Sequence, residues 1–330
     1  MLIDVLILIV GVIVVLILAN IVIRSTIKLA KHFGWSGAFI GLTILSIGTS
    51  IPEIMTAVFS SIDIVKNPSL MQTLSGLVVG TNVGSDIFQQ SFILPLVGLV
   101  GTIVVIKKNL IKEVGALILG AVLMWFMCFG GVITRLEGFI MLAAYMGYLI
   151  YLERQQMHET TIHGVVHSEK KKRLERKNIA MQIVIILLGF IIMGFAANQV
   201  IDKSTILVSE LAISASFFGV LLLGVASALP ELMTALVAVI KGKKDISAGV
   251  LIGSNVTNPL MGIGLGALIS GYAVPRVTLL YDLPAKIGIA LLIFYFLWRN
   301  EKLNKWEAIV LIVIFIAYLV LRNLLFPVDF

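Results

Sequence analysis

Apolar runs of about 20 residues recur along the whole chain, and they restrict its fold more than any other feature. A run of that length crosses the hydrocarbon core of a bilayer as an α-helix, in which the backbone N–H and C=O groups bond to one another. Of the 330 residues, 59% are hydrophobic and 13% are charged, whereas soluble domains carry about 25% charged residues. Transmembrane β-barrels alternate apolar and polar positions in segments of about ten residues, and this chain does not. The sequence therefore predicts an all-α membrane protein.

Ten membrane spans are predicted, and the loops between them differ in charge. Of the 25 Lys and Arg residues, 19 lie in one alternating set of loops. Such residues accumulate in cytoplasmic loops, so we expect that set to be cytoplasmic and both termini to lie outside a cell membrane. The loops account for the net charge of +7, and nucleic acid is not expected as a partner. The spans are 4–23, 36–61, 72–97, 113–131, 134–152, 179–199, 210–240, 246–271, 283–298 and 305–324. The less basic set holds Lys66, Arg135, Lys203, Arg276, Lys286 and Arg322.

The chain contains an internal duplication. Residues 48–58 read GTSIPEIMTAV and residues 227–236 read SALPELMTAL, so Glu53 and Glu231 occupy matching positions. Further along each copy, GSDIFQ at 84–89 matches GSNVTN at 253–258. With five spans in each copy, the second copy enters the membrane in the opposite orientation. We expect two inverted five-helix repeats, residues 1–152 and 179–330, joined by a basic cytoplasmic loop over 153–178, with interrupted helices at the centre.

Three carboxyl groups lie deep in apolar runs: those of Glu53, Asp86 and Glu231. A charged side chain at the bilayer centre costs roughly 2.5–3.5 kcal/mol on insertion scales, so such residues face the protein interior or a water-filled cavity. The alternative for each is a structural, hydrogen-bonded carboxyl. That alternative weighs most for Asp86, because Asn255 stands at the matching position in the second copy.

Pro52 and Pro230 directly precede the two glutamates. Proline lacks an N–H and clashes with the carbonyl four residues earlier, so it frees carbonyls near Gly48 and Ala226. A free carbonyl that lines an ion cavity is a ligand, and matching helix breaks in two halves indicate a transporter binding site. The candidate ligands are Thr49, Ser50, Glu53 and Ser85 in the first copy, and Ser227, Glu231, Ser254 and Asn258 in the second.

All of these ligands are oxygens. Ca²⁺ takes about 6–8 oxygen ligands in irregular geometry, and Na⁺ also accepts carbonyls and hydroxyls. No His or Cys neighbours either glutamate, which disfavours zinc, copper and nickel. Two glutamates carry enough charge to neutralise one divalent cation, and no resident cofactor is expected. One loop cluster has two interpretations: a metal-sensing site, or a solvated basic linker that contacts anionic lipid. The cluster consists of His158, His163, His167 and the run 170–173.

The two motif pairs resemble the α-repeats of the cation/Ca²⁺ exchanger superfamily, most closely its Na⁺/Ca²⁺ exchanger branch. The resemblance covers both copies and the ten-span layout. It implies that Glu53 and Glu231 bind Ca²⁺ and Na⁺ alternately. The other positions it implies are Thr49 and Ser227 at the calcium position, Ser85 and Ser254 with carbonyls near Ser46 and Gly224 at flanking sodium positions, and Asn258 near the centre.

The chain departs from the family pattern in its first copy. Gln89 stands where the family often has Asn or Asp, and Asp86 replaces the usual Asn, which leaves its role open. Glu53 and Ser85 are 32 residues apart, against 23 for the matching pair in the second copy. A second register would make Thr81 the partner of Ser254. We prefer the register that pairs Ser85 with Ser254, because GSDIFQ fits the family pattern better.

The sequence favours a secondary antiporter that exports Ca²⁺ against inward Na⁺ while two helices slide past the rest of the bundle. The nearest alternative is H⁺-coupled exchange of Ca²⁺ or another divalent cation, with the same glutamates protonated in place of sodium binding. A channel is a further alternative, which would lack counter-ion-dependent exchange. An enzyme is not expected, because no histidine lies in any predicted span and no second aspartate pairs with Asp86.

Overall fold

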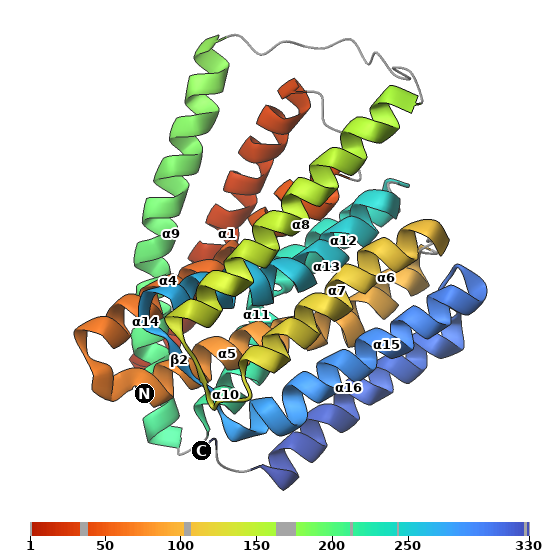
Figure 1. Ribbon diagram of the computed structural model, residues 1–330. Coiled ribbons are helices and arrows are strands. Elements are labelled where there is room, and N and C mark those ends of the chain that lie inside the picture. Colours follow the sequence, from red (N-terminus) through yellow and green to blue (C-terminus); the bar gives the residue numbers. More distant parts are fainter. Residues whose placement is uncertain are drawn as a thin grey trace.

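The computed structural model describes residues 2–33, 39–101, 107–162, 176–211, 214–242, 244–326 and 329 as a bundle of helices (Figure 1). Two helices, α1 (Leu2–Phe33) and α9 (Arg176–Leu211), pair along one edge, and α15 (Leu283–Asn300) and α16 (Lys305–Leu325) pack at the opposite edge. The other α-helices are α3 (Ser46–Thr49), α4 (Ile51–Lys66), α5 (Met71–Phe88), α6 (Leu94–Val100), α7 (Lys107–Met127), α8 (Arg135–Ile162), α10 (Ala215–Phe218), α11 (Gly224–Ser227), α12 (Leu229–Ile240), α13 (Lys244–Thr257) and α14 (Gly264–Ser270).

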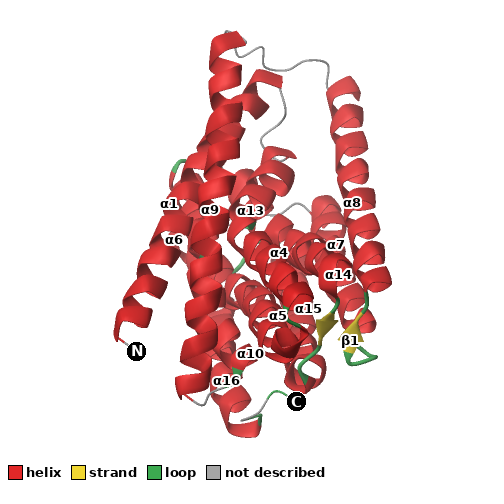
Figure 2. Cartoon of the chain, turned by 90° about the vertical axis from the view of Figure 1, so that its left-hand side faces the viewer, coloured by secondary structure: helices red, strands yellow, loops and turns green. Residues whose placement is uncertain are grey.

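Wider π-type turns interrupt the central helices at matching places in the two copies. In each copy one π turn leads into the short helix before a Pro-Glu pair, and another begins at the last residue of the GSDIFQ or GSNVTN motif. Figure 2 shows α4, α5 and α13 in the middle of the bundle, with α1 and α9 on one side and α8 on the other. The π turns are η1 (Ile40–Leu45), η3 (Gln89–Ile93), η4 (Gly219–Leu223), η5 (Asn258–Ile263) and η6 (Thr278–Asp282), and η2 (Pro68–Leu70) is a 3₁₀ turn.

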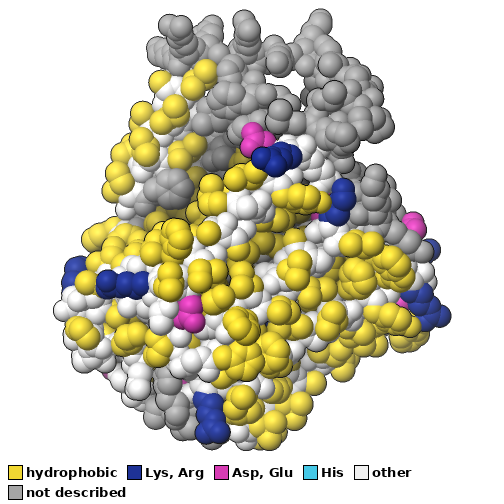
Figure 3. All heavy atoms as spheres, viewed as in Figure 1, with side chains coloured by type: hydrophobic (Ala, Val, Ile, Leu, Met, Phe, Trp, Pro, Cys, Tyr) yellow, Lys and Arg dark blue, Asp and Glu magenta, His cyan; other side chains and the backbone are white. Residues whose placement is uncertain are grey.

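Seven helical stretches among the described residues are long and apolar enough to cross a membrane. An eighth is obtained when Gly41–Thr49 and Ile51–Lys66, which are bent by 52° relative to one another, count as one span. The chain is thus a multi-pass helical membrane protein, while the ten-span inverted repeat stays a prediction. Its outer surface is largely hydrophobic (Figure 3), and Leu119, Ile191 and Phe195 are each at least 68% exposed.

Two helices extend beyond the predicted spans into the basic loop. Helix α8 continues to Ile162 and α9 begins at Arg176, whereas the sequence predicts a loop over 153–178. The charged stretch 153–162 contains Glu, Arg, Gln and Met and no Gly or Pro, so it propagates a helix after its apolar face has ended. His163, His167 and the run 170–173 lie outside the described residues, as does the side chain of His158.

Connections between helices group at two ends of the bundle. At one end, β1 (Val132–Ile133) pairs antiparallel with β2 (Tyr272–Ala273), and Asp329 accepts the backbone N–H groups of Ser216 and Arg276. At the other end, α6 and α12 meet where Gly101 lies against Val239. The cytoplasmic assignment of the basic end stays a prediction from charge.

Helices of the two copies pack against each other at glycines, where the two backbones come close together. Helix α5 of the first copy lies on α10, η4 and α11 of the second, and α13 of the second lies on η1 and α3 of the first. A Cβ at Gly84 would come 2.5 Å from Val220 Cα, and a Cβ at Gly253 would come 2.7 Å from the Leu42 carbonyl. Leu42 and Val220 are themselves matching positions, 178 residues apart as the two glutamates are. Gly84 and Gly253 therefore make equivalent contacts in the two copies. This equivalence favours the register in which the following residues, Ser85 and Ser254, match.

Candidate cation-binding site

Each glutamate lies directly after a break between two helices. Ser50 separates α3 from α4 with φ −80° and ψ 4°, and Ala228 separates α11 from α12 with φ −81° and ψ 0°. The following proline occupies the first turn of the new helix, where its missing N–H costs no hydrogen bond. Glu53 and Glu231 therefore stand in the first turns of α4 and α12, where the positive end of the helix dipole stabilises a carboxylate.

All of the residues predicted to bind cations are brought into the protein interior, and none is more than 9% exposed. Glu53 accepts a hydrogen bond on Oε1 from the Ser85 hydroxyl at 2.8 Å. Ser85 in turn accepts from the Gln89 amide at 3.1 Å, and the Gln89 oxygen accepts from the Ser254 hydroxyl at 2.5 Å. One chain of hydrogen bonds thus joins the first glutamate to the second copy.

Three of the four oxygens of the two glutamates make no hydrogen bond to the described residues. These are Glu53 Oε2 and both carboxylate oxygens of Glu231, although both side chains are at most 2% exposed. A buried ionised carboxylate is costly unless a partner compensates it. Glu231 also lies close enough to Glu53 and Asp86 to be affected by their charges, and Glu53 is affected by the charge of Asp86.

Two hydroxyls cross between the copies toward these carboxylates. Thr49 of the first copy lies beside Glu231, and Ser227 of the second lies beside Glu53. Neither makes an aligned hydrogen bond to the carboxylate, because Thr49 donates to the Leu45 carbonyl at 2.9 Å and Ser227 to that of Gly224 at 3.2 Å. The hydroxyl oxygens of Thr49 and Ser227 therefore keep lone pairs with which to bind a cation.

The backbone carbonyls expected at the flanking positions lie in equivalent surroundings. The Ser46 carbonyl accepts the N–H of Ser50, and the Gly224 carbonyl accepts that of Ala228. Each retains a second lone pair, since a carbonyl oxygen has two. The Ser50 hydroxyl is buried and has no hydrogen-bond partner among the described residues.

Asp86 differs from the glutamates because it is fully paired. Its Oδ2 forms an ion pair with the Lys286 ammonium, and both side chains are 0% exposed. Its Oδ1 accepts from the Asn258 amide at 2.8 Å. The assignment of Lys286 to a loop was wrong, since the residue lies in α15 and is buried by packing against α5. The signal was a lone lysine inside the predicted span 283–298, which requires a buried acidic partner.

Arg322 was also misassigned to a loop. It lies in α16 with 0% exposure and binds Asp282, with its Nε 2.8 Å from Oδ1 and its Nη2 3.1 Å from Oδ2. Arg322 also donates to the Ser216 hydroxyl at 2.5 Å. Two of the six basic residues of the less basic set are therefore internal, and the charge contrast between the two sets of loops is stronger than the sequence suggests.

Two amide oxygens of the site are free acceptors. Asn258 Oδ1 and Asn82 Oδ1 are buried and have no hydrogen-bond partner among the described residues. Asn82 donates to the Asn258 carbonyl at 2.8 Å and so lies next to the predicted ligands. Asn82 was not among the predicted ligands, although the alternative register paired its neighbour Thr81 with Ser254. Gln89 is different, because its oxygen accepts from both Ser254 and Asn255.

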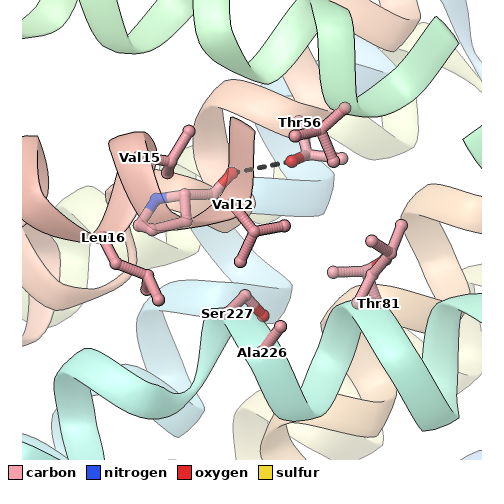
Figure 4. Close-up of a pocket in the computed structure, with 10 residues that line it drawn as sticks. Val12, Val15, Leu16, Thr56, Thr81, Ala226 and Ser227 are labelled. Carbon is pink, nitrogen blue, oxygen red and sulfur yellow. Dashed lines mark hydrogen bonds between the residues drawn. The ribbon is translucent and has the colours of Figure 1, made fainter. Parts of the chain in front are cut away.

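A cavity of ≈ 30 Å³ lies between α1 and the helix break of the second copy. Figure 4 shows Val12 of α1 pointing toward Ser227, with Thr56 donating a hydrogen bond to the Pro52 carbonyl at 2.8 Å. The cavity is about the volume of one water molecule. It ends at the same hydroxyl that lies beside Glu53, so the packing of α1 closes one side of the site.

The described residues contain no group of three or more His, Cys, Asp or Glu side chains arranged to hold a metal ion. A cation between Glu53 and Glu231 would therefore take most of its ligands from hydroxyl, amide and carbonyl oxygens. Such a set suits hard cations of low preference for geometry, such as Ca²⁺ and Na⁺.

The family model described as sodium/calcium exchanger protein matches residues 3–152 and 181–323. The chain belongs to the sodium/calcium exchanger protein family. This exchanger is 29% identical over 299 residues to the inner membrane protein YrbG of Escherichia coli, covering 89% of this chain and 88% of that protein. It is 26% identical over 333 residues to the sodium/calcium exchanger MaX1 of Methanosarcina acetivorans, covering 90% of this chain and 92% of that protein.

Solved structures share the fold of this exchanger. The sodium-calcium exchanger NCX_Mj superimposes with a TM-score of 0.65 over 96% of this chain and 98% of that one, at 22% sequence identity. The membership of the family that the motifs predicted is confirmed. The chain is accordingly a cation antiporter of the sodium/calcium exchanger type.

Proposed function

We propose that this exchanger couples the inward movement of Na⁺ to the export of Ca²⁺, with Glu53 and Glu231 as the carboxylates that both ions share. The observation that carries the proposal is the set of three buried carboxylate oxygens without hydrogen-bond partners among the described residues. A bound cation supplies the compensation that the protein does not. The names of the relative MaX1 and of the structural neighbour NCX_Mj agree with this pair of ions.

The charge of the site supports a divalent cargo. Lys286 neutralises Asp86, so Glu53 and Glu231 contribute the two negative charges that remain. One Ca²⁺ or two Na⁺ would balance them, and each occupancy excludes the other. Further Na⁺ would require neutral ligands, for which Ser85, Ser254 and the carbonyls of Ser46 and Gly224 are the proposed set.

Further neutral ligands are proposed among the hydroxyl and amide oxygens of the site. Thr49 and Ser227 place hydroxyl lone pairs beside the two glutamates, and Asn258 and Asn82 offer amide oxygens. Gln89 holds Ser85 and Ser254 in place through both ends of its amide. We propose that Gln89 positions these two hydroxyls, and that Asn258 acts as the direct amide ligand.

Alternating access is proposed to use α1 and α9. These helices pack along each other's length at one edge of the bundle (Figure 1), and α1 contacts α3 and α11 beside the two helix breaks. The contact of α1 with the site is apolar and leaves a water-sized cavity beside Ser227. Sliding of the pair would open that cavity toward one side of the membrane and close it toward the other without breaking the hydrogen bonds around Gln89.

The test is uptake of radiolabelled Ca²⁺ into proteoliposomes preloaded with Na⁺, with a proton-gradient arm and a no-gradient control. Uptake driven by the outward Na⁺ gradient, and lost in Glu53→Gln and Glu231→Gln, is the expected result. Uptake driven by the proton gradient alone would replace Na⁺ by H⁺ as the coupling ion. Ca²⁺ movement that needs no counter-ion would identify a channel and refute the antiport proposal.

A further inference from the structure

One buried ion pair lies at the site but has no counterpart in the second copy. Asp86 of α5 and Lys286 of α15 are both fully buried and are 200 residues apart in the chain. The position that matches Asp86 is Asn255, a neutral residue. The charge of Asp86 therefore has no match in the second copy, whereas the two glutamates match one another.

Both carboxylate oxygens of Asp86 are engaged by partners within the protein, unlike those of Glu231. Lys286 takes Oδ2, and Asn258 takes Oδ1 through its amide nitrogen at 2.8 Å. Because the nitrogen of Asn258 points to Asp86, its Oδ1 faces away, and that oxygen has no hydrogen-bond partner among the described residues. Asp86 thus orients an amide oxygen for ion binding without binding the ion.

Asp86 is nevertheless close enough to the site for its charge to matter. It follows Ser85, which hydrogen-bonds Glu53, and its charge acts on both Glu53 and Glu231. Without Lys286, the interior would hold three uncompensated carboxylates. An interior of low dielectric makes such a charge imbalance far more costly than it is in water.

We propose that Lys286 is a fixed internal cation, which occupies at Asp86 the place that a transported monovalent cation would otherwise take. The inference rests on the proposed function, since it assigns the charge of the same site. Lys286 then determines how many cations move in each cycle: with it, two carboxylates face the cargo, and without it, three do. Lys286 is a specificity-determining residue that contacts Asp86, while Asp86 positions Asn258.

The experiment measures the coupling ratio in proteoliposomes. The Na⁺ and Ca²⁺ gradients are fixed, the membrane potential is varied with K⁺ and valinomycin, and the potential at which Ca²⁺ flux reverses gives the number of Na⁺ exchanged per Ca²⁺. Lys286→Met removes the charge at similar volume. We expect this variant to exchange one more monovalent cation per Ca²⁺ than the unsubstituted protein, and Asp86→Asn/Lys286→Met to return to the original ratio.

The matched control is Arg322→Met, which breaks a second ion pair that is fully buried among the described residues, with Asp282. Arg322 contacts Ser216 and Asp282 rather than the glutamates. We expect this variant to lose stability, as a broken buried pair does, and to keep the original coupling ratio. A purely structural role for Lys286 predicts that Lys286→Met behaves in the same way.

If Lys286→Met does not fold, the inference is tested by measuring the Ca²⁺ affinity of Asp86→Asn. That variant leaves the ammonium unpaired beside the site, and its repulsion lowers Ca²⁺ affinity by about tenfold or more, whereas Asp86→Asn/Lys286→Met restores the affinity. An unchanged ratio in folded Lys286→Met, or an unchanged affinity in Asp86→Asn, refutes the inference alone. Absence of any coupled Ca²⁺ flux in the unsubstituted protein refutes the proposed function and this inference with it.

Discussion

Substitution of Gly84 by Ala tests how tightly the two copies pack. The added Cβ would meet Val220 Cα at 2.5 Å and the Val220 carbonyl at 2.7 Å. Ordinary contact begins at 3.4 Å, so the two backbones must separate by about 0.9 Å at this point. Overpacking of this kind costs roughly 1–3 kcal/mol, and the upper part of that range applies because backbone, and not a mobile side chain, has to move.

The assay is thermal unfolding in detergent, followed by Ca²⁺ flux. Gly115 is the matched control, since it lies in α7 and a Cβ there would meet nothing within 4 Å. Gly115→Ala is expected to raise stability by up to about 1 kcal/mol, because alanine is the better helix former. Gly84→Ala is expected to unfold at lower temperature and to lose flux, since Ser85 moves with it. Equal stability of the two variants would refute the close packing of α5 against η4.

Three further predictions concern the site and its supports. Glu231→Gln should abolish coupled Ca²⁺ flux and leave the unfolding temperature unchanged or higher, because its oxygens make no hydrogen bond to the described residues; normal flux would exclude Glu231 from the site. Tyr272→Phe should cost about 0.5–1.5 kcal/mol per hydrogen bond, since its hydroxyl bonds Ser61 at 2.6 Å and the Ala57 carbonyl at 2.8 Å, and unaltered stability would show those bonds to contribute nothing. Asn304→Ala should cost about 0.5–2 kcal/mol by removing the capping box of α16, measured by the same unfolding assay with Asn304→Ser as the conservative control.

The sequence predicted the features that depend on local composition. Runs of apolar residues identified helices, because a chain in lipid satisfies its backbone groups in no other local way. The prolines before Glu53 and Glu231 located the helix breaks that the structure has at Ser50 and Ala228. The repeated motif also predicted the family, which the comparisons confirmed. Helix ends were less accurate, since α8 and α9 continue where hydropathy has already fallen.

Tertiary structure decided which oxygens of the site are free. Asp86, Glu53 and Glu231 are all acids in apolar runs of the sequence. Among the described residues Asp86 alone of the three forms an ion pair, and its partner Lys286 is 200 residues away. Gln89 and Asn258 look interchangeable as amides, yet the oxygen of Gln89 is used within the protein and that of Asn258 is not. Hydropathy and motif spacing act over a few helical turns, whereas a hydrogen bond or ion pair between α5 and α13 or α15 depends on how distant helices pack. The sequence alone therefore determines the helices and the acids they carry, and the packing of the two copies determines which of those acids are left for a cation.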